Sequence, residues 1–297
     1  VDSAWKIVKD ILSIGIPIAF GACIMAILNS VDSKLCMNRL QSAAGFSYYQ
    51  AKVLYGVYGK AQTLFNLPAA FITPLTIAIV PEISGAIAKG ANAAARRTSA
   101  DAMRISAVIS LPMGVGLTVL AYPIMNVLYP NSNAAGPGLL AIMGAASFFV
   151  CTVLMENAIL QASGHEKLIV NWFLVAQRSI NIYGAPVGTL VSYVVMALMN
   201  YIFICVALKH RPKLFGIFAR PLAASVLMGA AAWAIYGLCS RFIGAVSWSR
   251  IALCMLVAIA VSVIVYLVST IALRSITKED MKLIPGGEKI ANFLHIR

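Results

Sequence analysis

Long apolar runs constrain this sequence more than any other feature. Only 11% of its 297 residues are charged, against about 25% in soluble globular chains. Runs of about 18 or more apolar residues are long enough to cross a membrane as helices. Seven such runs hold at most one acid each and no base: Ile11–Leu28, Leu64–Ile87, Ile105–Val127, Gly138–Ala162, Ile182–Leu208, Pro221–Ser240 and Ile251–Leu273. The sequence therefore predicts an all-α, polytopic membrane helix bundle.

An eighth apolar run, Leu168–Ala176, has only nine residues. As a helix it would cover about 13 Å of a hydrocarbon core roughly 30 Å thick. If this run crosses, most Lys and Arg residues gather on the side of the N-terminus, as expected of cytoplasmic loops. If it does not cross, they divide almost evenly. The charges thus favour eight crossings, one shortened, with both termini inside. A re-entrant segment is the competing interpretation and would put the C-terminal tail outside.

The loops carry the remaining topological signals. The longest, Ser30–Lys60, holds four tyrosines and is expected to form an interfacial segment outside the membrane. The basic loop Lys89–Arg104 is expected to be cytoplasmic. The formal net charge of +13 then reflects orientation and contact with anionic membrane lipids. No basic patch with interleaved aromatic residues supports nucleic-acid binding, so we expect no nucleic-acid partner.

Prolines recur inside the predicted spans. Proline removes a helical hydrogen bond and clashes with the preceding turn. One interpretation is close packing between helices, and the other is a set of bendable helices that line a transport cavity. The candidate bends are Pro68, Pro74, Pro81, Pro112 and Pro123.

Two acids lie within spans, where ionisable residues are functional candidates. Glu82 precedes Lys89 by seven residues, so it is either an interface-facing carboxylate or a transport residue. Glu156 adjoins Asn157 and lies five residues before Gln161. These three polar residues could hydrogen-bond neighbouring helices, or they could line a cavity and couple transport to an ion.

Four further polar residues flank spans. Asn29 and Asp32 lie near the outer end of the first predicted helix, where solvated termination competes with substrate contact. Arg104 and Arg220 lie at predicted cytoplasmic ends, where either could meet an anionic headgroup.

Residue patterns typical of catalysis or metal binding do not occur in the sequence. The six cysteines include no CxxC pair, and the three histidines have no metal-ligand spacing. We therefore expect no enzyme activity and no cofactor, apart from a possible coupling cation or membrane potential. A membrane enzyme that handles polyprenyl phosphates would need paired acids or a histidine near the membrane, and the outer loops offer only Asp32.

At several positions the sequence resembles the polysaccharide-transporter and stage V sporulation protein B group. This group belongs to the multidrug/oligosaccharidyl-lipid/polysaccharide (MOP) exporter superfamily, with the lipid II flippase MurJ and the MATE transporters. The stretch YGVYGKAQTLFNLPAAFITPLTIAIVPEISGA (Tyr55–Ala86) resembles the group's eighth helix and the loop before it. Further similar stretches, in order, are Ile14–Leu35, Met103–Pro130, Glu156–Lys167 and Ile180–Val195.

The resemblance implies one lobe of a fourteen-helix fold. Residues 1–209 would form the second transporter lobe with a shortened eleventh helix, residues 210–273 two extra helices, and residues 274–297 a cytoplasmic tail. The N-terminal lobe, a lipid-linked sugar substrate and membrane lipids would be the partners. The implied function is alternating-access export of a lipid-linked oligosaccharide or peptidoglycan precursor across the bacterial cytoplasmic membrane, as in cell-wall synthesis or sporulation. The alternative is a cation-coupled, MATE-like multidrug exporter with Glu156 as its essential carboxylate.

Overall fold

A computed structural model describes residues 34, 37–38, 41–42, 47–130, 132–164, 184–208, 214–243, 247–273 and 275. The long elements in these ranges are all helices, and six of them are long and apolar enough to cross a membrane. The all-α membrane bundle is thereby confirmed. The predicted span Ile11–Leu28 and the short run Leu168–Ala176 lie outside the described residues. The helices are α2 (Tyr48–Phe65), α3 (Leu67–Ala88), α4 (Asn92–Val119), α5 (Ala121–Leu128), α6 (Gly136–Ala162), α8 (Gly184–Ala207), α9 (Leu214–Ile243) and α10 (Trp248–Ala272).

The second half of the predicted loop Ser30–Lys60 is helical, which corrects the expectation of a loop up to Lys60. The α2 helix begins at Tyr48 and continues through a short break at Asn66 into α3. Its start is a capping box: Gln50 N–H donates to Ser47 Oγ over 3.3 Å, and Ser47 N–H donates to Gln50 Oε1 over 3.1 Å. The Ser-x-x-Gln spacing was a readable signal for this start.

The predicted basic loop Lys89–Arg104 is also mostly helix. Only a tight turn around Gly90, whose φ of 73° suits glycine, separates α3 from α4. The predicted span Ile105–Val127 is in turn broken at Leu120, between α4 and α5. Pro123 explains the position of the break, because it has no N–H to bond the carbonyl of Val119, four residues earlier.

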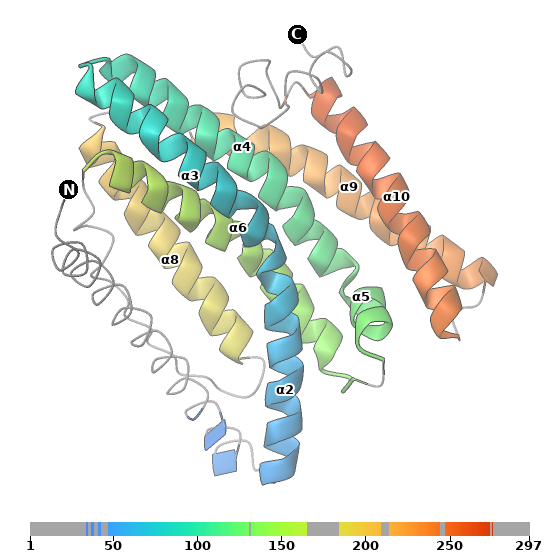
Figure 1. The fold of residues 1–297 in the computed structure, drawn as a ribbon. Coiled ribbons are helices and arrows are strands. Elements are labelled where there is room, and N and C mark those ends of the chain that lie inside the picture. Colours follow the sequence, from blue (N-terminus) through green and yellow to red (C-terminus); the bar gives the residue numbers. More distant parts are fainter. Residues whose placement is uncertain are drawn as a thin grey trace, which may run out of the picture.

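Helix α6 lies at the centre of the described bundle (Figure 1). Its first half packs against α2 in one hydrophobic cluster, and its second half packs against α3 and α4 in another. Gly136, the first residue of α6, faces Val57 of α2. The first nine residues of α2 therefore project beyond the start of α6. The projecting end of α2 carries Tyr48, Tyr49 and Tyr55, and its place outside the membrane stays a prediction.

Helices α6 and α8 run in the same direction. Ala185, at the start of α8, packs with Leu139 and Leu140 near the start of α6. Ile204 and other residues near the end of α8 pack with the end of α6. Gly164 and Gly184 therefore lie towards opposite ends of the bundle.

Candidate functional site

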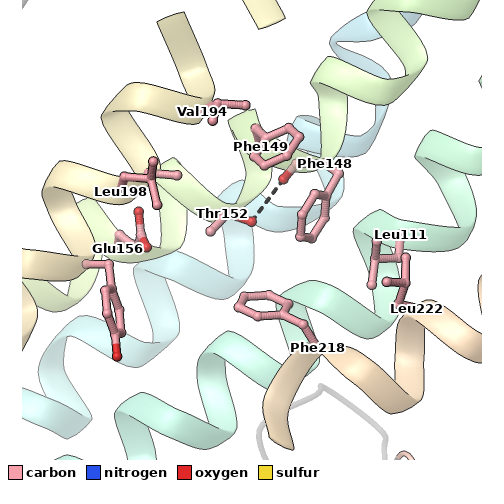
Figure 2. A pocket seen from close by; sticks show the side chains of 11 residues that line it. Leu111, Phe148, Phe149, Thr152, Glu156, Val194, Leu198, Phe218 and Leu222 are labelled. Carbon is pink, nitrogen blue, oxygen red and sulfur yellow. Dashed lines mark hydrogen bonds between the residues drawn. The ribbon is translucent and has the colours of Figure 1, made fainter. Parts of the chain in front are cut away.

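Glu156 lines a cavity inside the described bundle, of about 260 Å³. Its side chain is 2% exposed, and it lies six residues, or about 9 Å, before the end of α6. Figure 2 shows Glu156 beside Leu198 on one wall and Phe218 with Leu222 on another. The walls come from α4, α6, α8 and α9: Leu111, Phe148, Phe149, Thr152, Glu156, Val194, Ala197, Leu198, Tyr201, Phe218 and Leu222.

The cavity offers Glu156 no counter-charge. No Lys, Arg or His is among the described residues that line it. Carboxylate Oε2 of Glu156 has no hydrogen-bond partner within the described structure. The hydroxyl of Thr152 donates instead to the carbonyl of Phe148 over 3.0 Å. Burying a negative charge here is costly, so the carboxyl group would either be protonated or bind a cation.

The residues predicted to act with Glu156 lie elsewhere. Asn157 faces α8, where Asn200 Nδ2 donates to Asn157 Oδ1 over 2.8 Å. This amide pair is a direct polar link between two membrane helices. Gln161 is exposed near the end of α6. Glu156, Asn157 and Gln161 thus have three different environments, because each step along the helix rotates the side-chain direction by about 100°.

Glu82 and Arg104 lie on the α3–α4 hairpin at the predicted cytoplasmic end. Glu82 is exposed, and its Oε1 accepts a hydrogen bond of 3.4 Å from Thr98. Arg104 forms an ion pair of 3.6 Å with Asp101 in the preceding turn. Arg220 is exposed on α9, one residue before Pro221. Asn29 and Asp32 lie outside the described residues.

The five candidate prolines differ in their surroundings. Pro68 is buried in the first turn of α3, where proline costs little, and Pro123 is buried early in α5. Pro74 and Pro81 are exposed within α3, which runs through both of them. Pro112 lies inside α4, beside the cavity residue Leu111.

Sequence reasoning missed a polar face along α2 and α3. Gln62, Thr63, Asn66 and Thr73 are all exposed, within about 100° of one another around the helix. Asn66 lies nine residues after Val57, so it is about 14 Å inside the level where α6 begins. The two threonines bond backbone carbonyls within their own helix. The helical spacing of these residues was a readable signal, but only the charged residues of this part of the chain were weighed as polar candidates.

An open apolar groove of about 750 Å³ runs along α9 on the outer surface. Phe215, Val226 and Leu227 are among its lining residues, and Leu273 closes one end. Phe218 and Leu222 line both this groove and the cavity of Glu156. These two side chains therefore lie between the cavity of Glu156 and this groove.

Across the described residues, no three His, Cys, Asp or Glu side chains gather where a metal ion could bind. The site therefore offers one isolated buried carboxylate, one exposed polar helix face and one apolar groove. These three features can exchange a proton or cation, hydrogen-bond a polar headgroup and accept an alkyl chain, respectively.

Residues 2–133 match a family model described as "Polysaccharide biosynthesis protein". The chain is also similar to the "Uncharacterized membrane protein YabM" of Bacillus subtilis, at 23% identity over 98% of this chain and 56% of that protein. The chain thus spans a little over half the length of this curated relative. No solved structure is significantly similar. The matches and the six apolar helices make the chain a multi-pass membrane protein.

Proposed function

We propose that the chain forms part of an exporter that moves a lipid-linked saccharide across the bacterial cytoplasmic membrane. The observation that carries this proposal is the polar face of α2 and α3. Exposed amides at bilayer depth are unfavourable against lipid, since hydrocarbon offers them no hydrogen bonds. Sugar hydroxyls and phosphate oxygens can pair with amide groups, and water can do so between transport events.

The direction of this polar face suits a headgroup path. Gln62, Asn66 and Thr73 follow one another along about 17 Å of helix, so a headgroup could exchange hydrogen bonds stepwise while it crosses. The groove along α9 offers a separate apolar surface for the lipid tail. The similarity to a polysaccharide biosynthesis family supports the choice of saccharide over other polar cargo.

The test replaces Gln62 and Asn66 by Leu in the full-length protein and follows lipid-linked precursor on the cytoplasmic leaflet. Loss of two hydrogen bonds of about 1 kcal/mol each predicts an export rate lowered by about tenfold or more. Ile77→Leu is the control, because Ile77 is an exposed apolar residue of α3, and this variant should export normally. Normal export by the double variant, at equal protein level in the membrane, would contradict the proposal.

A cation-coupled exporter is the second candidate, and the buried carboxylate of Glu156 favours it. Its unpartnered Oε2 in a cavity without basic residues suits reversible binding of a proton or a cation. Glu156→Gln keeps the shape and removes the charge. If this variant folds but transport no longer depends on an imposed ion gradient, Glu156 is the coupling site. If its transport keeps the gradient dependence of the wild type, the carboxylate has a structural role only.

A further inference from the structure

The hydrogen-bond ladder of α4 is interrupted in its apolar half. Pro112 lies inside the helix and has no N–H, so the carbonyl of Val108, four residues earlier, loses its helical donor. Val108 is buried, and an unpaired carbonyl in a membrane interior costs free energy. Some other group must therefore satisfy this carbonyl.

The donor comes from the other end of the sequence. Tyr266 of α10 donates its hydroxyl to the carbonyl of Val108 over 2.6 Å. This bond joins residues 158 positions apart, and it connects α10 to the main-chain atom that Pro112 leaves free. The tyrosine is thus the substitute for the missing peptide N–H.

A second bond secures the far end of the same segment. The indole Nε1 of Trp248, the first residue of α10, donates to the carbonyl of Val127 over 3.1 Å. Val127 lies in the last turn of α5, where carbonyls lack helical donors. Between the two bonds, Leu120 at the helix break is 3% exposed and packs in one cluster with Ala258 of α10.

The three contacts share one antiparallel register. Along α10, Trp248 and Tyr266 are 18 residues apart, or about 27 Å. Val108 and Val127 are 19 residues apart, across the break at Leu120. The two donors and the two free carbonyls are therefore separated by similar numbers of residues, and Figure 1 shows α10 beside α5.

We propose that α10 is a splint for the interrupted α4–α5 segment, and that Tyr266 is the positioning residue that holds the interruption at Pro112. The contact of Tyr266 with α4 is close in sequence to the cavity of Glu156, because Leu111 lines that cavity and directly precedes Pro112. Movement of α4 at Pro112 must break the tyrosine bond or carry α10 with it. Helix α10 thus controls the shape of α4, whatever cargo the protein carries.

A double-mutant cycle tests whether Tyr266 acts through Pro112. Pro112→Ala restores an N–H for the Val108 carbonyl, so the tyrosine bond should become redundant. In wild-type protein, Tyr266→Phe should lower the apparent melting temperature in detergent by about 2–4 °C, as expected for one lost hydrogen bond. In the Pro112→Ala background, the same change should cost less than about 1 °C. Equal losses in the two backgrounds would overturn the proposal.

A distance measurement separates positioning from simple stabilisation. Nitroxide amino acids at Ala94 and Tyr122, both exposed, report on the angle between α4 and α5. Tyr266→Phe should broaden or shift their distance distribution, and adding Pro112→Ala should narrow it again. Tyr49→Phe is the control, because the Tyr49 ring on α2 is 76% exposed, and it should change nothing. A distribution unchanged by Tyr266→Phe would refute the splint.

Discussion

At the residue scale, two glycines decide how closely α4 and α6 approach. A Cβ on Gly144 would lie 2.7 Å from Thr118 Oγ1 and 2.8 Å from Thr118 N. A Cβ on Gly114 would lie 2.8 Å from the carbonyl oxygen of Gly144. Thr118 Oγ1 also donates to the carbonyl of Ala141 across the interface, over 3.1 Å. Small residues therefore allow these two backbones to meet, as they do in many membrane bundles.

We predict that Gly144→Ala destabilises the protein by about 2 kcal/mol, since the new methyl group meets backbone that cannot move aside. The melting temperature in detergent measures the effect. Gly59→Ala is the control: Gly59 is in α2, and its added Cβ would meet nothing within 4 Å. That control should be neutral or stabilising by up to about 1 kcal/mol, because alanine favours helix. Equal destabilisation by both substitutions would contradict the close crossing.

The sequence could not distinguish Gly114 and Gly144, which lie at a close helix crossing, from the other glycines of the apolar runs. Both lie in apolar surroundings, and helical periodicity does not say which helix a residue will face. The same limit affected the polar candidates. Glu156 was found because an acid in a long apolar run is conspicuous. Gln62 and Asn66 were missed because uncharged amides near the start of a predicted span are ordinary in sequence, and they become informative only when the folded helix exposes them.

At the element scale, one arginine joins two helix ends. Arg96 Nε of α4 donates to the carbonyl of Leu208, directly after the last residue of α8, over 2.8 Å. The end of a helix presents free carbonyls and a partial negative charge, and a guanidinium complements both. This contact fixes the end of α8 to the α3–α4 hairpin.

We predict that Arg96→Ala frays the end of α8 and costs about 1 kcal/mol, a modest value because the contact is only partly buried. Amide exchange of residues 204–208 should quicken. Lys89→Ala removes a neighbouring exposed charge from the same hairpin and should leave that exchange unchanged. If Lys89→Ala speeds the exchange of residues 204–208 as much as Arg96→Ala does, then Arg96 contributes only its charge and not its hydrogen bond to Leu208.

Helix positions were more predictable than helix ends. The six predicted spans from Leu64 onward each match a described membrane-length helix, because long apolar runs leave few alternatives. The ends were wrong where a helix continues beyond the membrane, as at Tyr48 and Asn92. Polar residues in these helix ends can be solvated while they remain helical. The apolar run that hydropathy detects therefore ends before the helix ends.

At the scale of the whole molecule, opposite ends of the bundle differ in chemistry. The α3–α4 turn carries Lys89 and is followed by Arg96 and Arg97, which suits a cytoplasmic side. At the other end Lys60 lies over the ring of Tyr129, with its ammonium 5.2 Å from the ring centre, and Trp248 bonds Val127. Tyrosine and tryptophan gather at membrane–water interfaces. These residues favour an orientation with the α3–α4 turn on the cytoplasmic side.

We predict that the α3–α4 turn faces the cytoplasm and the α5–α6 turn faces outward. Ala91 and Ala134 are exposed in these two turns, so Ala91→Cys and Ala134→Cys form a matched pair. A membrane-impermeant maleimide should label Ala134→Cys in intact spheroplasts, and Ala91→Cys only after permeabilisation. The wild-type protein gives the background from the native cysteines. The reverse pattern would invert the orientation, and labelling of both in intact spheroplasts would contradict the arrangement of α4 and α5 as one crossing.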